Sequence, residues 1–335
     1  MDAEYVDLGG AEKENQYVHN YTAPWEIYSI AFSSRAAYPY RLGIGSIIND
    51  SDNYVEVVQL NPESRKLEKK FQFDHKFAPT KIMWVPDTMN NAPDLMATSG
   101  EMLRVYNIEN NERAVLKCEL TSNKKELMAP LTSFDWNSQT LNMVITCSID
   151  TTCSIWDISQ QSLIRTLIAH DKEVLDVSFS PEPQMFATVG ADGSVRHFDI
   201  RDLSKSDILY EMSHFLVRVA WNKNNKHYVA VVAMDDNSVT LLDTRKHSTP
   251  LSRLAFHKGP VNHLAWAPHS GYHICSVSDD MQALIWDLKK ISPEIKAPLL
   301  EYMAQGEISN LSWGLQESDW IALCFGKQLQ ILRVY

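Results

Sequence analysis

The sequence lacks the features that mark secreted and membrane-spanning proteins. It has five Cys, an odd number, and none of them forms a Cys-x-x-Cys pair. We therefore expect reduced thiols in an intracellular protein. Residues 1–15 are polar and acidic and contain no apolar core of a signal peptide. There is also no run of about 18 apolar residues, so we expect no membrane span.

The chain is also short of positive charge. It has 31 Lys and Arg against 42 Asp and Glu, which gives a formal net charge of −11. Nonspecific binding to DNA, RNA or anionic membranes requires patches of Lys and Arg. The composition therefore argues against nucleic acid or a membrane as a direct partner.

Motifs of two common classes of enzyme are missing. No Gly-x-Ser-x-Gly turn is present to expose a Ser nucleophile. The segment Gly43–Gly45 lacks the third glycine and the following helix of a dinucleotide-binding fingerprint. His269 and His273 have a spacing that zinc could use, but no Cys pair or carboxylate completes a set nearby in sequence. We expect no catalytic residue, no metal and no cofactor.

What the sequence does have is an internal repeat. A turn that starts with Asp is followed by a strand-like run that ends in an aromatic residue and an Asp, with Leu in place of the aromatic residue in one copy. The pattern recurs at Asp150–Ile158, Asp192–Ile200, Asp236–Thr244 and Asp280–Leu288. The leading Asp residues are spaced 42, 44 and 44 residues apart. A period of roughly 40–45 residues with Trp-Asp endings is typical of the blades of a WD-repeat propeller.

An aromatic residue near the end of a short apolar strand recurs in step with this pattern. It occurs seven times, at Phe32, Trp84, Trp136, Phe179, Trp221, Trp266 and Trp313. The sequence therefore predicts an all-β, seven-bladed propeller, formed as a single domain by residues 16–335 after a flexible segment 1–15. The last repeat ends without a fourth strand, so we expect Gln16–Tyr21 to supply that strand and close the ring.

His, Ser or Thr, Asp and Trp recur at fixed places in the repeats. The members that the sequence assigns to such polar tetrads are His257, Ser276, Asp280 and Trp286; His170, Thr188 and Asp192; and Thr146, Asp150 and Trp156. A Ser, His and Asp set could be a protease triad, but a triad needs one nucleophile and an oxyanion hole. Because the set recurs once per repeat, we interpret it as hydrogen bonding inside the blades.

Several longer stretches resemble one particular group of WD-repeat proteins. Ala129–Asn137, Cys147–Ile158, Ile168–Val174, Leu264–Ser270, Gln282–Leu288 and Glu307–Trp313 look like the Transparent Testa Glabra family of plants and its animal relatives. The resemblance extends from about residue 17 to residue 335. It implies a non-enzymatic scaffold in the cytoplasm and nucleus. Plant members join MYB and basic helix-loop-helix transcription factors, and animal members are adaptors for DYRK- and HIPK-type kinases.

The same resemblance implies a second role, as substrate receptor of a cullin-RING ubiquitin ligase. That role is tied to a Trp-Asp-x-Arg motif, and the nearest forms here contain Asp199 with Arg201 and Asp243 with Arg245. Neither form begins with Trp. On the layout of WD-repeat proteins, Lys172, Glu173 and Lys258 lie in loops of one face. These seven residues are our candidates for binding protein partners.

The competing hypothesis from another class is a propeller enzyme with an active site on the axis. It requires ionisable side chains that converge on the axis from several blades. The innermost strands supply few of these by sequence, mainly Asp176 and His263. We therefore expect a monomeric propeller that acts within larger complexes with kinases, transcription factors or ubiquitin-ligase subunits.

Overall fold

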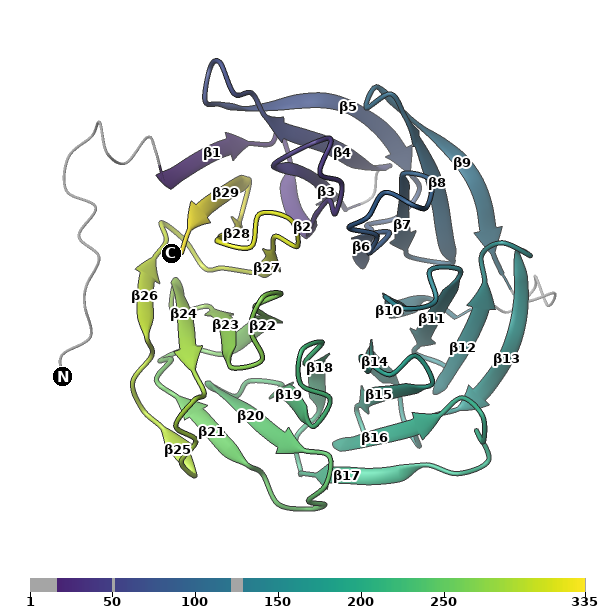
Figure 1. Cartoon of the computed structure of the whole chain (residues 1–335), viewed down its shortest axis with the longest axis vertical. Coiled ribbons are helices and arrows are strands. Elements are labelled where there is room, and N and C mark those ends of the chain that lie inside the picture. Colours follow the sequence, from purple (N-terminus) through teal and green to yellow (C-terminus); the bar gives the residue numbers. More distant parts are fainter. Residues whose placement is uncertain (1–16, 50–51, 122–128, 335) are drawn as a thin grey trace.

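The strands form a ring of seven blades, as the repeat predicts (Figure 1). The structure is a computed structural model that describes residues 17–49, 52–121 and 129–334. Every regular element assigned within these ranges is a β-strand. The prediction of an all-β, seven-bladed propeller is confirmed.

Each blade is a sheet whose strands follow one another from the centre of the ring outward. Blades 1 and 2 consist of β2 (Glu26–Phe32), β3 (Arg41–Ile47), β4 (Asn53–Leu60) and β5 (Leu67–His75), then β6 (Lys81–Trp84), β7 (Leu95–Ser99), β8 (Leu103–Glu109) and β9 (Arg113–Leu120). Blades 3 and 4 consist of β10 (Leu131–Trp136), β11 (Met143–Ser148), β12 (Thr152–Asp157) and β13 (Ser162–Ile168), then β14 (Val174–Phe179), β15 (Met185–Gly190), β16 (Ser194–Asp199) and β17 (Asp207–Glu211).

The last three blades depart from this simple order at their outer edges. Blade 5 consists of β18 (Leu216–Trp221), β19 (Tyr228–Ala233), β20 (Ser238–Asp243), β21 (Ser252–Ala255) and the added parallel strand β25 (Glu294–Ile295). Blade 6 consists of β22 (Val261–Trp266), β23 (His273–Ser278), β24 (Gln282–Asp287) and β26 (Leu300–Met303). Blade 7 consists of β27 (Asn310–Trp313), β28 (Trp320–Phe325), β29 (Gln328–Arg333) and β1 (Val18–Thr22).

The closing strand of blade 7 comes from the N-terminal part of the chain. β1 pairs antiparallel with β29, from Val18 opposite Leu332 to Thr22 opposite Gln328. The predicted closure of the ring is therefore confirmed, and the strand begins two residues after the expected Gln16. The segment 1–15 lies outside the described residues.

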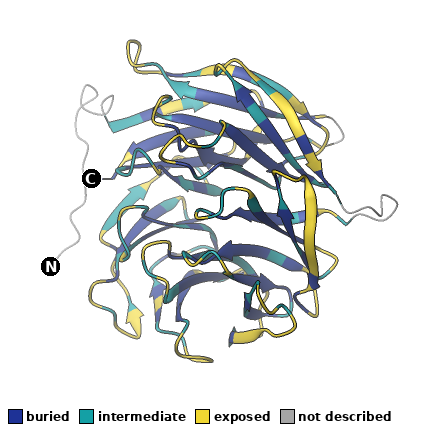
Figure 2. Cartoon of the chain, turned by 45° about the vertical axis from the view of Figure 1, so that its right-hand side comes forward, coloured by how far each residue is buried: buried dark blue, intermediate teal, exposed yellow. Residues whose placement is uncertain are grey.

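The core is divided among the contacts between neighbouring blades. Seven clusters of buried apolar side chains occur among the described residues, and each contains residues of two adjacent blades. Strand β23, for example, is buried along its length after His273, because blades pack on both of its faces. Figure 2 shows buried residues along the strands and exposed ones mainly in loops and outer strands. Since no blade buries its faces alone, the ring folds as one unit.

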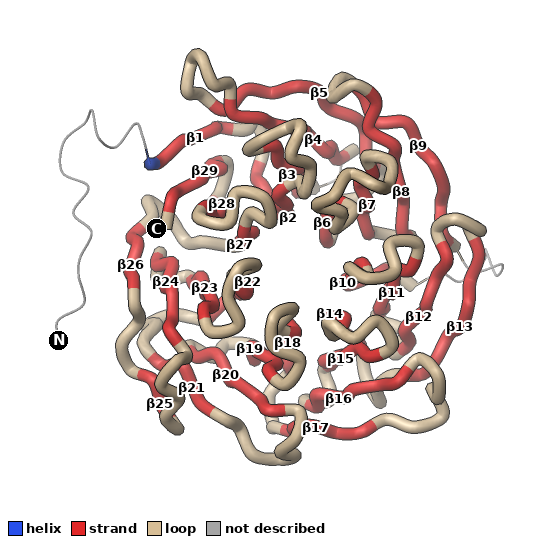
Figure 3. The backbone as a smooth tube through the Cα atoms, in the orientation of Figure 1, coloured by secondary structure: helices blue, strands red, loops and turns tan. Residues whose placement is uncertain are grey.

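The loops define two faces of the ring. We call upper the face that carries the loops leading into the innermost strands and the turns between the second and third strands. We call lower the face that carries the remaining connections. Because antiparallel strands alternate in direction, every blade sends the same two kinds of loop to the same face (Figure 3). A residue's place in its repeat therefore decides which face it reaches.

Candidate functional site

The polar tetrad of blade 6 is a continuous chain of hydrogen bonds. Trp286 Nε1 donates to Ser276 Oγ at 2.9 Å, and Ser276 lies 2.8 Å from His257 Nε2. The Nδ1 of His257 lies 3.0 Å from Asp280, whose carboxylate also accepts the backbone N–H groups of Lys258 and Gln282. Burial lowers the pKa of His257, so the imidazole is neutral and carries its proton on Nδ1.

Blade 4 has the same chain up to its last member. His170 Nε2 lies 2.7 Å from Thr188 Oγ1, and Nδ1 lies 2.9 Å from Asp192. Burial raises the pKa of Asp192, but the Ser194 hydrogen bonds and His170 outweigh it and bring that pKa to about 2. Phe198 occupies the place of the Trp, so Thr188 receives no indole N–H.

Blade 3 has only the two ends of the chain. Trp156 Nε1 donates to Thr146 Oγ1 at 2.9 Å. Asp150 accepts from the backbone N–H and the hydroxyl of Thr152, and so caps its own turn. The fifth repeat differs from the sequence pattern, because Asp236 pairs with Arg253 at 3.1 Å and His214 Nδ1 lies near Ser213 instead.

The sequence missed one polar pair, in blade 2. His75 Nε2 lies 3.0 Å from Thr98 Oγ1, and its Nδ1 lies 2.5 Å from Phe77 O. Thr98 stands at the place of Thr188 and Ser276, near the end of the second strand. The sequence signal that could have predicted this pair is the Thr at that place together with a His at the end of the preceding outer strand.

These geometries decide what the tetrads can do chemically. Ser276 is fully buried and its oxygen already accepts from Trp286, while its proton is shared with His257. A nucleophile must reach a substrate carbon, and neither His257 nor Ser276 faces an open space. The tetrads therefore tie the second and third strands of a blade to the loop that enters it.

The candidate partner-binding residues separate onto two faces. Asp199 with Arg201 and Asp243 with Arg245 lie where the third strands end, on the lower face. Each Arg folds back onto its own Asp, with Nη2 to carboxylate distances of 2.5 and 2.7 Å. On the upper face, the exposed loops before β14 and β22 carry Lys172, Glu173 and Lys258. The two groups therefore cannot form one binding site.

Lys172 and Lys258 belong to a connected surface that we call the upper patch: Lys172, Phe215, Met234, Lys258 and Met281. Lys172 Nζ lies 5.6 Å from the centre of the exposed Phe215 ring. The backbone N–H of Met234 donates to Phe215 O at 2.8 Å. Met234 and Lys258 line the same pocket of about 390 Å³, and the backbone N–H of Lys258 donates to the carboxylate of Asp280, which precedes Met281 in the same turn. The patch crosses blades 4 to 6.

Exposed apolar side chains are more numerous in the loops of the upper face. In its described loops they are Phe77, Ile149, Phe215, Met234 and Met281. In the described loops of the lower face they are Met89, Tyr272, Leu299 and Leu315. Aromatic and Met side chains are enriched in protein–protein interfaces. The upper face therefore has the composition of a docking surface.

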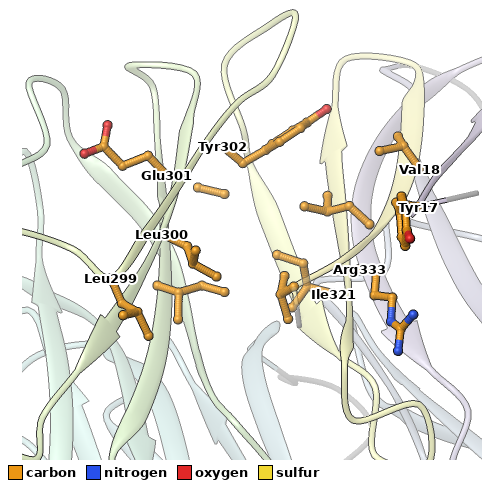
Figure 4. A pocket seen from close by; sticks show the side chains of 12 residues that line it. Tyr17, Val18, Leu299, Leu300, Glu301, Tyr302, Ile321 and Arg333 are labelled. Carbon is orange, nitrogen blue, oxygen red and sulfur yellow. The ribbon is translucent and has the colours of Figure 1, made fainter. Parts of the chain in front are cut away.

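A further apolar groove lies at the outer rim between blades 6 and 7, with a volume of about 650 Å³. Figure 4 shows Leu299, Leu300 and Tyr302 on one side, with Val18, Ile321 and Arg333 on the other. Glu301 and Arg333 are the charged residues of its lining. The closing strand β1 forms part of its wall, so the groove exists only in the closed ring.

The centre of the ring holds more charge than the sequence suggested. The seven innermost strands each contribute one polar side chain, three residues before the aromatic marker, and all seven line one space of about 370 Å³: Ser29, Lys81, Ser133, Asp176, Arg218, His263 and Asn310. We call this set the channel ring. The expectation that Asp176 and His263 are the main ionisable groups was incomplete, because Lys81 and Arg218 stand at the same level.

Among the described residues, no group of three or more His, Cys, Asp and Glu could hold a metal ion. No helix in the described part of the chain has the length and apolar character needed to cross a membrane. All five Cys are buried free thiols, including Cys147 and Cys153, which face each other on β11 and β12.

Comparison with known proteins places this arrangement in a family. Residues 124–157, 161–199 and 248–287 match the family described as WD domain, G-beta repeat. A DDB1- and CUL4-associated factor 7 homolog of Dictyostelium discoideum is 48% identical over 324 residues, covering 96% of this chain and 100% of that protein. The chain belongs to this family of WD-repeat proteins.

Two yeast WD-repeat proteins are similar over most of the chain. An uncharacterized WD repeat-containing protein of Schizosaccharomyces pombe is 29% identical, covering 94% of this chain and 89% of that protein. A WD repeat-containing protein of Saccharomyces cerevisiae is 28% identical, covering 87% of this chain and 72% of that protein. The likeness thus spans nearly the whole ring in each case.

The three WD-repeat segments are also the ones that hold the polar tetrads. The first contains Thr146 and Trp156, the second His170 with Asp192, and the third the complete chain of blade 6. In blade 2, where Tyr106 stands in place of Trp, the His75–Thr98 pair lies outside these segments. The WD-repeat pattern therefore follows the internal bonding of the blades.

Proposed function

We propose that this WD-repeat chain is a non-enzymatic adaptor that holds kinases or transcription regulators in larger complexes, in the cytoplasm and nucleus. The upper patch is the observation that carries the proposal. It offers two exposed cations, an aromatic ring and two Met side chains on a rigid base. Partners bind such surfaces through apolar anchors surrounded by polar contacts. The polar tetrads serve stability, so the chain needs no active site for this role.

The ring acts as a single copy within these complexes. The ring of blades is closed, because β1 pairs with β29 and completes the sheet of blade 7. A closed propeller presents few free strand edges for self-association. Its loops remain available for different partners on the upper and lower faces.

The substitution Met234→Glu should remove partners that dock on the upper face. It places a charge in the middle of the upper patch, where Met234 is 49% exposed. We expect recovery of such a partner to fall by about tenfold or more, since loss of a central anchor costs about 2 kcal/mol. Affinity purification from native cells, followed by mass spectrometry, measures this.

The matched control is Met89→Glu, because Met89 is 79% exposed on the lower face. Kinases or transcription regulators recovered with wild type and Met89→Glu, but lost with Met234→Glu, would support the proposal. Equal recovery with all three proteins would show that the upper patch is not the docking surface. Recovery of no stable partner by wild type would contradict the adaptor role itself.

A second candidate function is that of a substrate receptor in a cullin-RING ubiquitin ligase. Two observations favour it: the Dictyostelium relative is named as a DDB1- and CUL4-associated factor homolog, and Arg201 and Arg245 are exposed on the lower face. A ligase adaptor bound there leaves the upper patch free for a substrate.

The double substitution Arg201→Ala with Arg245→Ala should then abolish capture of DDB1. Both guanidinium groups are largely exposed, but Arg245 neutralises the buried carboxylate of Asp243, so the melting temperature of the double variant is compared with that of wild type before capture is measured. Co-precipitation with purified DDB1 tests this, with Met234→Glu as the control on the other face. Undiminished capture by the double variant would refute a role for these two residues.

A further inference from the structure

On one side of the channel ring, both oxygens of the Asp176 carboxylate are engaged. One oxygen of Asp176 accepts from Ser133 Oγ at 2.6 Å, and the other accepts the backbone N–H of Val219 at 2.9 Å. Lys81 Nζ lies 3.1 Å from Ser133 Oγ and 3.6 Å from Asp176. The carboxylate of Asp176 is therefore already compensated by groups from neighbouring blades.

The other side of the ring has donors without partners. Arg218 donates from Nη1 to the carbonyl oxygen of Val217 at 3.0 Å, but its buried Nε has no hydrogen-bond partner among the described residues. The buried Nδ1 of His263, on the neighbouring blade, also has no hydrogen-bond partner among the described residues, and this nitrogen is a donor in one of the two neutral tautomers of the ring. Both residues line the central space. Buried donors without an acceptor are costly, and such groups call for an explanation.

The balance of charge in this space is positive. Lys223 Nζ lies 3.2 Å from Asp135, and these two groups compensate each other. Lys81 and Arg218 then stand against a single carboxylate, that of Asp176. This local excess of one positive charge occurs in a chain whose net charge is −11. Low-dielectric walls concentrate such a field along a channel.

The neutral state of His263 is consistent with a positive field. Burial is the largest cause that lowers the pKa of its imidazole, and the nearby Arg218 lowers it further, to about 3. Asp176 opposes these effects without overcoming them. A neutral imidazole still has one N–H to donate, and it adds no charge of its own.

We propose that the channel ring binds a small oxyanion of the phosphate type, held by Arg218 and Lys81, with His263 as a neutral donor. A guanidinium group matches the spacing of oxyanion oxygens and forms charge-assisted hydrogen bonds with them. The space of about 370 Å³ admits a small molecule. The site is separate from the upper patch, so its occupancy does not depend on the adaptor role.

Titration of the full chain with sodium phosphate in a calorimeter, at ionic strength held constant with sodium chloride, tests the site. Wild type should bind phosphate saturably at one site. Arg218→Gln should weaken binding about tenfold or more, because a hydrogen bond to a charged group contributes about 1.5–3 kcal/mol. Lys81→Gln should weaken binding as well, and it keeps the test usable if Arg218→Gln does not fold.

The matched control is Arg245→Gln, which removes the same charge from the lower face. Wild-type affinity in this control, together with weakened binding in the ring variants, supports the channel site. Two results overturn it: no saturable binding by wild type, as expected if water alone fills the ring, or equal affinity in wild type and every folded variant.

Discussion

A chain that begins at residue 23 should unfold at a markedly lower temperature than the full chain. The deletion removes β1 and its five residue pairs with β29. It also removes the buried His19, whose ring stacks on Trp320 at a centroid distance of 5.7 Å, and Tyr21, whose hydroxyl donates to Glu56. β1 thus holds blade 7 and contacts blade 1 as well, so its loss opens the ring at both.

The expected loss is roughly 3–5 kcal/mol, if each net hydrogen bond contributes about 1 kcal/mol. In a chain of this size, with an unfolding entropy of about 2.1 cal/mol/K per residue, that corresponds to a fall of roughly 4–7 °C in melting temperature. Differential scanning calorimetry measures it. Deletion of residues 1–15, which leaves β1 in place, is the matched control and should change the melting temperature much less.

A peptide added in trans distinguishes ring closure from a general effect of shortening. A peptide of residues 16–24 should bind the shortened chain, because it restores a strand to the exposed edge of β29. Binding should recover part of the lost melting temperature in proportion to peptide concentration. An unchanged melting temperature in the shortened chain would contradict the closure that the sequence and the structure both indicate.

The blade strands were predictable because turn-forming residues mark where each strand begins and ends. In blade 6, β23 (His273–Ser278) lies between segments that contain Pro, Ser, Gly and Asp, which favour turns and so mark where the strand begins and ends. The N-terminal strand was predictable for a different reason. Gln328–Arg333 reads as the third strand of the seventh repeat, and the strand-like run Gln16–Tyr21 precedes the first repeat, so the two were expected to pair.

The channel ring was harder to predict from one sequence. Taken alone, Lys81 or Arg218 is one charged residue in a short apolar strand, and nothing in that strand's own sequence indicates a binding role. Its meaning comes from comparing the seven inner strands, in which the polar side chain stands three residues before each aromatic marker. That offset is readable in the sequence, but the fold is needed to show that the seven side chains line one central space.

The division of the candidate partner residues also required the fold. In the sequence, Lys172 and Arg201 both lie in loops of the same repeat, one before its first strand and one after its third. The direction of each strand puts the first on the upper face and the second on the lower face. Phe215 was not predicted as a binding residue, because a single aromatic residue in a loop belongs to no repeated pattern. In the fold it lies against Lys172.

The substitution Asp280→Ala should destabilise the ring far more than the same change at Asp150. Asp280 accepts hydrogen bonds from His257 Nδ1 and from two backbone N–H groups. Its loss leaves the buried imidazole of His257, at the centre of the hydrogen-bond chain, without an acceptor for its N–H. Asp150 occupies the same turn of blade 3, but among the described residues it accepts hydrogen bonds from Thr152 alone. Because an unsatisfied buried donor costs about 1–3 kcal/mol, we expect roughly 3 kcal/mol for Asp280→Ala and about 1 kcal/mol for Asp150→Ala. Urea unfolding of both variants measures the difference, and equal losses would show that His257 does not link Asp280 to Ser276 and Trp286 energetically.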